Sequence, residues 1–277
     1  MLRARVVTAL VMVAVLLAAL FVLPAWGFCA IATVLLGGAA WEWWGLARHA
    51  RGIRWSYAVG IGVVFVALAG VAGLWMGRPG ALVLYPVYVA AFVFWAIAVP
   101  IWLGRNPQAL APSLVLGAGV VVLIPAFLGF AQLRNIHPGS LLLTMGVVWV
   151  ADIAAFFAGR RFGKHKLAPR VSPGKTWEGL GGAVLATACY AVAWAEFAPR
   201  LLPPLVRDLP GTVFWTLAVV ELITVFSVLG DLFESAMKRQ AGVKDSGRLL
   251  PGHGGLLDRI DALTSTLPLA ALIWMSA

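Results

Sequence analysis

Repeated apolar runs of about 18–22 residues limit how this chain can fold more than any other feature does. A helix of that length spans the hydrocarbon core of a bilayer with every backbone hydrogen bond satisfied internally. The strands of a membrane barrel would appear as short alternating segments, and none are seen. Hydrophobic residues make up 62% of the 277 positions and charged residues 12%, too few polar residues to cover a soluble domain. The sequence therefore predicts an all-α, polytopic integral membrane protein.

About nine runs are expected to be transmembrane helices, and Pro, Gly and charged residues mark the joints between them. The first run is longer than the apolar core of a signal peptide, so we expect it to remain as a helix. No soluble domain or repeat is visible, which favours one domain over 1–277, with N-terminal helices in 1–140 and the active site in 141–277. The expected spans are 6–23, 27–47, 55–76, 81–103, 112–130, 141–158, 177–198, 212–231 and 257–275.

The basic residues predict the orientation of these helices. With a cytoplasmic N-terminus, 17 of the 21 Lys and Arg residues lie in cytoplasmic segments, as the positive-inside rule requires. The opposite orientation would place those 17 outside. The net charge of +10 is therefore a topology signal, and nucleic-acid binding is not expected.

Two cytoplasmic segments, 159–178 and 231–261, carry more charge than topology requires. Together they hold 11 of the 21 basic residues and six of the 11 acidic ones, while the first half of the chain is chemically bare by comparison. We therefore expect the functional site in the second half.

Four carboxylates are expected to meet at one membrane face. Asp258 and Asp261 stand three apart at the start of the last span, so a helix places both on one face. Asp231 ends the eighth span on the same side, and Asp152 lies two turns inside the sixth. Mg²⁺ suits such a site because it takes one or two protein carboxylates and completes its shell with water and phosphates. For each aspartate alone, a helix-capping charge is the alternative.

Basic residues supply the complementary half of the site. S-P-G-K-T-W-E-G (172–179) is interpreted as a helix start with Ser172 as N-cap and Pro173 at the first helical position, which together with Lys175 would bind an anion. It is not a P-loop, because Pro169 stands where that motif needs a glycine and no strand precedes it. An ordinary capped helix with an interfacial lysine is the alternative.

The loop before the last span is rich in glycine. In G-H-G-G (252–255), the backbone must approach another group closely or adopt positive φ, and His253 is expected to contact phosphate rather than zinc. A solvated loop histidine is the alternative. Glu221, in the middle of the eighth span, has no expected partner and its role stays open. Further phosphate contacts are expected from Lys238, Arg239, Lys244 and Arg248, for which positive-inside charge is the alternative.

Carboxylates for Mg²⁺, several Lys and Arg residues and a glycine-rich backbone are typical of phosphoryl or nucleotidyl transfer. The segment 235–261 then resembles a known family. Its pattern S-x-x-K-R-x₄-K-D, followed by P-x-H-G-G-x-x-D-R-x-D, is that of the phosphatidate cytidylyltransferase (CDP-diacylglycerol synthase) family, and every fixed position is met. The upstream segment 152–179 is also similar to that family, particularly its bacterial members, whereas the first five spans match only in hydropathy and helix number.

The resemblance implies transfer of CMP from CTP to phosphatidate, giving CDP-diacylglycerol and pyrophosphate for phospholipid biosynthesis at a bacterial inner membrane. It also implies Mg²⁺, a monovalent cation such as K⁺ as a candidate second ion, and a homodimer. Catalytic residues carried over from the family are Asp231, Asp258, Asp261 and Lys244, with the three aspartates as metal ligands. The substrate-binding residues carried over are Asp152, Ser172, Lys175, Lys238, Arg239 and His253.

Two other classes of function remain as alternatives. A CTP-dependent lipid kinase, or a cytidylyltransferase for another lipid phosphate, would use similar carboxylates. A transporter of a phosphorylated solute would favour broken helices or inverted repeats near the midplane. Here the charge lies at one face and in the second half only, which favours an enzyme.

Overall fold

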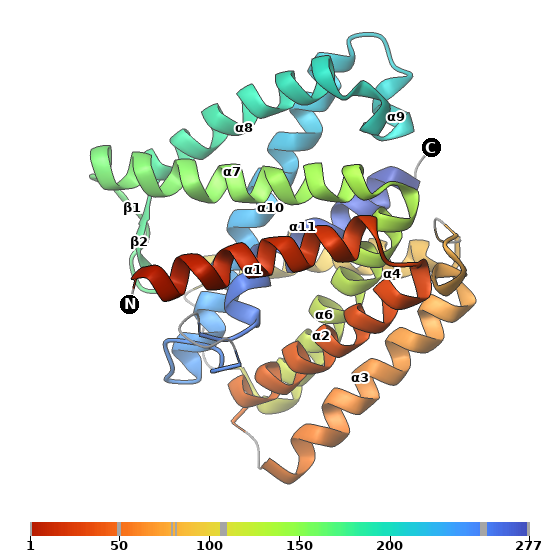
Figure 1. Ribbon diagram of the computed structural model, residues 1–277. Helices are drawn as coiled ribbons and strands as arrows, with labels where there is room; N and C mark the ends of the chain where they lie inside the picture. Colours follow the sequence, from red (N-terminus) through yellow and green to blue (C-terminus); the bar gives the residue numbers. More distant parts are fainter. Residues whose placement is uncertain are drawn as a thin grey trace.

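A computed structural model of the chain describes residues 2–48, 51–78, 80, 82–105, 110–249 and 254–275. Helices make up nearly all of this structure (Figure 1). The helices are α1 (Leu2–Phe21), α2 (Ala25–Leu46), α3 (Arg51–Val71), α4 (Tyr85–Val93), α5 (Val99–Gly104), α6 (Pro112–Ile136), α7 (Pro138–Phe162), α8 (Trp177–Phe197), α9 (Pro204–Arg207), α10 (Thr212–Gln240) and α11 (Leu257–Met275). A π-helical turn, Phe94–Ala98, joins α4 to α5, and short 3₁₀ turns occupy Leu74–Met76, Leu82–Leu84 and Pro199–Leu201.

Seven helical segments of the described chain are long and apolar enough to cross a membrane, so this is a polytopic membrane protein. Helices also lie at the first and last expected spans, as α1 and α11, but these two are not among the seven. In α11 the reason is its charged start, where Asp258, Arg259 and Asp261 fall in the first five residues. The seven segments are Ala25–Leu46, Ile53–Val71, Leu82–Gly104, Pro112–Ile136, Pro138–Phe162, Trp177–Phe197 and Thr212–Gln240.

Helix α11 lies at the centre of the bundle, and most of its side chains from Ala262 onward are buried. It packs against α4, α6 and α10, while α7 packs along α8 and α2 packs along α3 (Figure 1). The start of α1, the hairpin before α8 and the loop after α10 lie at one end of the molecule, and α9 lies at the other (Figure 1). The segments richest in charge therefore gather at one end of the helices.

The segment before α8 is a β-hairpin rather than the start of a helix. β1 (Lys166–Ala168) and β2 (Ser172–Thr176) pair antiparallel, with Ala168 opposite Ser172. The prediction that Ser172 and Pro173 begin a helix is therefore wrong, because β1 already satisfies the backbone of this segment. Helix α8 begins at Trp177 instead, and Thr176 is its N-cap, whose hydroxyl accepts a hydrogen bond from Gly179 N at 3.1 Å.

Helix α10 continues past the expected end of the eighth span, to Gln240. Asp231 consequently lies inside a continuous helix, not at its end. The extension is helical because its apolar residues recur at helical spacing and are buried, two of them, Leu232 and Ala236, against Val171 of the hairpin. These buried residues are Leu232, Phe233, Ala236 and Met237.

Candidate active site

Three aspartates from α7, α10 and α11 form the acidic cluster, which we define as Asp152, Asp231 and Asp261. Gly230 brings two of them together, because a Cβ at this position would lie 2.6 Å from the carbonyl oxygen of Asp261 and force α10 and α11 apart. Asp261 interacts electrostatically with both Asp231 and Asp152. These three aspartates thus come from three helices that meet at the cluster.

Lys175 joins the hairpin to this cluster. Its Nζ lies 2.6 Å from Asp231 Oδ2, and the two side chains are 24% and 27% exposed. The other oxygen of Asp231 accepts a hydrogen bond from Ser235 Oγ at 3.2 Å. The two charged segments singled out in the sequence are therefore in direct contact, although Lys175 belongs to a strand and not to a helix N-terminus.

A second lysine is bound more deeply. Lys238 Nζ lies 2.6 Å from Asp258 Oδ1 and 3.2 Å from Glu234 Oε1, and none of the three side chains is more than 12% exposed. The sequence reasoning omitted Glu234. Its position four residues before Lys238 on a helix is a signal that could have identified it.

Asp258 also holds the loop that precedes α11. Its Oδ2 accepts hydrogen bonds from Ser246 N at 3.0 Å and from Gly255 N at 2.9 Å, and Ser246 Oγ lies at 3.1 Å. Together with Lys238, these donors occupy both oxygens of the carboxylate. Asp258 therefore links α10, the loop and the first turn of α11.

Glu42 brings the first half of the chain into the same network. This buried residue of α2 accepts hydrogen bonds on Oε2 from Leu257 N at 2.9 Å and from Ser246 Oγ at 3.2 Å. Two glycines make room for it: a Cβ at Gly255 would lie 2.7 Å from Glu42 Oε2, and one at Gly247 would collide with Oε1. Sequence reasoning treated this half as bare, although an acid inside an apolar run is costly and is itself a signal of function.

Other predicted contacts lie around the cluster. Arg239 Nε donates to Val171 O at 3.4 Å and so ties α10 to the hairpin, while Lys244 is exposed in the loop. Ser172 is part of β2. His253 lies outside the described residues, and its predicted phosphate contact stays a prediction.

Two further features of the sequence find partners or explanations. Gly254 adopts a positive φ of 81°, as the glycine-rich pattern predicted for this loop. Glu221, for which the sequence offered no partner, accepts a hydrogen bond from Thr187 Oγ1 at 3.1 Å and so links α10 to α8.

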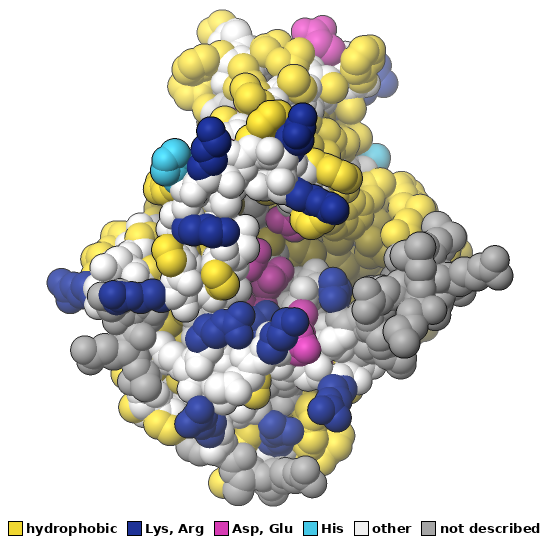
Figure 2. Space-filling model, turned by 90° about the vertical axis from the view of Figure 1, so that its left-hand side faces the viewer, with side chains coloured by type: hydrophobic (Ala, Val, Ile, Leu, Met, Phe, Trp, Pro, Cys, Tyr) yellow, Lys and Arg dark blue, Asp and Glu magenta, His cyan; other side chains and the backbone are white. Residues whose placement is uncertain are grey.

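Carboxylates outnumber lysines inside this site. Figure 2 shows acidic side chains within a hollow, with Lys and Arg side chains around it. Two lysines, Lys175 and Lys238, are in ion pairs with carboxylates of a larger set: Asp152, Asp231, Glu234, Asp258 and Asp261. Such a surplus of hard oxygen donors fits Mg²⁺. The described part of the chain contains no group of three or more His, Cys, Asp or Glu residues placed to hold a metal by themselves.

Comparison with known proteins gives consistent relatives. The sequence pattern of the cytidylyltransferase family matches residues 3–276, and so includes the first half, where the motifs alone showed no likeness. A phosphatidate cytidylyltransferase of Pseudomonas aeruginosa is 38% identical over 99% of this chain and 97% of its own length. One of Haemophilus influenzae is 37% identical over 97% and 96%. One of Brucella suis is 44% identical over 53% of this chain. The chain therefore belongs to the cytidylyltransferase family.

Proposed function

We propose that this chain transfers CMP from CTP to phosphatidate, giving CDP-diacylglycerol and pyrophosphate for phospholipid biosynthesis. The observation that carries the proposal is the similarity, over nearly the whole chain, to two enzymes named for this reaction. The acidic cluster and its surrounding basic residues are the kind of site that the reaction requires, because both substrates are phosphates.

The reaction places few demands on acid–base chemistry. A phosphate oxygen of phosphatidate, already ionised, attacks the α-phosphorus of CTP. The bond from that phosphorus to the oxygen bridging to the β-phosphorus breaks, and pyrophosphate leaves with the electron pair. No proton needs to move, so the protein's task is to hold the two phosphates in line and to offset their negative charge.

Asp231 and Asp261 are the residues that we assign to Mg²⁺. Both belong to the acidic cluster, and the surplus of carboxylates over lysines supports a divalent cation there. The bound ion would neutralise charge on the phosphates that react. Asp258 as a third ligand stays a prediction, because its two oxygens already accept hydrogen bonds from the protein. A second, monovalent cation also stays a prediction.

Lys175 is the residue that we assign to the triphosphate of CTP. It lies at the acidic cluster with a quarter of its side chain exposed, so its ammonium group can reach a phosphate without unfolding the hairpin. Arg239 and Lys244, both exposed, are assigned to the surrounding phosphate contacts. Lys238 is more deeply buried between Glu234 and Asp258, which favours a positioning role for it.

We further propose that the acidic cluster opens to the cytoplasm from a bacterial inner membrane. The excess of basic residues in the segments at that end supports this orientation, and the similar enzymes are bacterial. Attachment of a thiol reagent to a Cys introduced at Ser246 should occur only from the cytoplasmic side. Labelling from outside intact cells would overturn this orientation. A homodimer stays a prediction.

The test of the proposed function is turnover by the purified protein in detergent. With CTP, dioleoyl phosphatidate and Mg²⁺, we expect pyrophosphate and CDP-diacylglycerol in equal amounts, and a loss of both when a chelator removes the metal. A lipid kinase would instead release CDP. Formation of CDP, or no pyrophosphate with any lipid phosphate, would contradict the proposal.

A further inference from the structure

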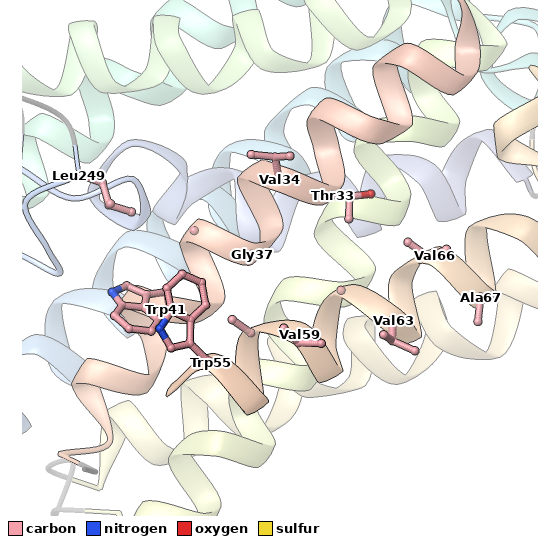
Figure 3. A pocket seen from close by; sticks show the side chains of 13 residues that line it. Thr33, Val34, Gly37, Trp41, Trp55, Val59, Val63, Val66, Ala67 and Leu249 are labelled. Atoms are coloured by element: carbon pink, nitrogen blue, oxygen red, sulfur yellow. The ribbon is translucent and has the colours of Figure 1, made fainter. Parts of the chain in front are cut away.

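An apolar groove runs between α2 and α3, with a volume of about 890 Å³. We call it the α2–α3 groove; Thr33, Gly37, Trp41, Trp55, Gly62 and Leu249 are among the residues that line it (Figure 3). Its size falls within the range of about 300–1,000 Å³ that is usual for small-molecule sites. The hydroxyl of Thr33, its one polar side-chain group other than the indoles, donates to Cys29 O at 2.8 Å within the same helix. The groove thus presents an apolar surface.

The two ends of the groove differ, as the two ends of a lipid do. Trp41 and Trp55 lie together near Leu249 at one end, with ring centroids 4.5 Å apart (Figure 3). The guanidinium of Arg54 stands 5.3 Å from the Trp41 ring. Tryptophan and arginine are typical of the membrane–water interface, where headgroups lie. The opposite end, near Val66, is lined by apolar side chains and by Thr33, whose hydroxyl is already bonded within α2 (Figure 3).

The length of the groove matches the thickness of the hydrocarbon region in one leaflet of a bilayer. From Thr33 to Trp41 the axis of α2 rises about 12 Å, and from Trp55 to Ala67 that of α3 rises about 18 Å. One leaflet contributes about 15 Å of hydrocarbon. Because α2 and α3 are both long and apolar enough to cross a membrane, an acyl chain lying in this groove would remain at its ordinary depth.

The interfacial end of the groove adjoins the candidate active site. Leu249 belongs to the loop that carries Ser246, which hydrogen-bonds to Asp258. At Gly38, which also lines the groove, a Cβ would lie 3.5 Å from Leu249 and 3.4 Å from Leu256, two residues before Asp258. A lipid whose chain lies in the groove would therefore hold its headgroup beside the loop that Asp258 and Glu42 organise.

We infer that the α2–α3 groove binds one acyl chain of phosphatidate during the reaction, an assignment that rests on the proposed function. The floor of the groove is open at Gly62, where an added Cβ would meet no heavy atom within 4 Å. A larger side chain there fills the groove without disturbing the helix packing. Gly60, on the same helix but outside the groove, is equally free of neighbours and provides a matched control.

The experiment compares Gly62→Leu with Gly60→Leu on two substrates, dioleoyl and dihexanoyl phosphatidate, in the same detergent. We expect Gly62→Leu to raise the KM for the dioleoyl lipid about tenfold, because about two methylenes lose their apolar contacts. The KM for the dihexanoyl lipid and for CTP should stay unchanged, and Gly60→Leu should resemble wild type. An equal rise in KM for both lipids, or none, would overturn the assignment. The assignment would also be overturned if Gly62→Leu changed the oligomeric state and its effect on KM did not depend on acyl-chain length. That result would indicate that the groove is a contact between two copies of the chain.

A second readout separates this inference from the proposed reaction. Phosphatidate carrying a diazirine in one acyl chain is photolysed with the wild-type protein, and its attachment points are mapped by mass spectrometry. Attachment to α2 and α3, reduced in Gly62→Leu, is the expected result even if no CDP-diacylglycerol forms. Turnover without attachment to these helices would support the proposed reaction and would show that the α2–α3 groove does not bind the acyl chain.

Discussion

Two lysine–aspartate pairs of equal length, 2.6 Å each, occupy the candidate active site in different surroundings. Lys175 and Asp231 join a surface hairpin to α10, and about a quarter of each side chain is exposed. Lys238 and Asp258 are more deeply buried and share further partners, among them Glu234 and Ser246. The two pairs therefore have equal distances but different exposure: Lys175–Asp231 is the accessible pair and Lys238–Asp258 is the enclosed pair.

The difference indicates which pair can take part in the reaction. An accessible ion pair contributes little to stability, and its partners can exchange for a substrate phosphate or a cation. An enclosed pair is costly to break, because removal of one partner leaves a buried charge without compensation. We therefore assign the first pair to the reaction and the second to the framework that positions it.

Asp231→Asn tests the accessible pair and has the largest expected effect on rate. The substitution keeps the shape of the side chain but removes the charge, and with it several kcal/mol of charge neutralisation, so turnover should fall by about 10³-fold. The thermal unfolding temperature should change little. Both are measured on purified protein, by pyrophosphate release and by unfolding in detergent.

Asp208→Asn is a suitable control for this charge change. Asp208 is an exposed acid that pairs with Arg207, in the segment after α9 at the other end of the molecule. This control should keep wild-type turnover. Near-normal turnover by Asp231→Asn would show that Asp231 does not bind the metal and that the accessible pair does not take part in the reaction.

Lys238→Met tests the enclosed pair, and its main effect should be on folding. It leaves Glu234 and Asp258 buried without their cation, for which the expected loss is roughly 3–5 kcal/mol of unfolding free energy. Lys175→Met, the matched change in the accessible pair, should cost less than about 1 kcal/mol and instead raise the KM for CTP. Equal losses of stability in the two variants would show that the pairs do not differ as proposed.

The sequence predicted the membrane-spanning helices more completely than it predicted the site. Hydropathy locates a helix because a spanning segment must be apolar along its whole length, and a helix lies at each of the nine expected places. Hydropathy does not show where a helix ends once it has left the membrane. The eighth span was therefore expected to end at Asp231, whereas α10 continues to Gln240. Hydropathy also does not reveal the pairing of two strands, because the pairing depends on two segments at once. The prediction that Ser172 is a helix N-cap was therefore wrong.

The same limit explains why Glu42 was missed. Nothing near it in the chain explains its charge, because its partners, Ser246 and Leu257, come from the opposite end of the sequence. The glycine-rich motif predicted either a close backbone approach or a positive φ within 252–255, but it could not name Glu42 as the group that Gly255 approaches. A contact between distant segments becomes visible only when the fold brings them together.

Glu42 extends the enclosed framework into α2, and substitutions there should have the smallest of these effects on rate. Glu42→Leu leaves Leu257 N without its acceptor and frees Ser246, so the loop shifts and turnover should fall by about tenfold. Glu42→Gln keeps an acceptor oxygen and should restore turnover to within about twofold of wild type. Because Glu42 would act by positioning Asp258, kcat should change and the KM for CTP should not. A Gln variant as slow as the Leu variant would mean that the charge of the Glu42 carboxylate is required. Its hydrogen bonds to the loop would then not explain why α2 carries an acid.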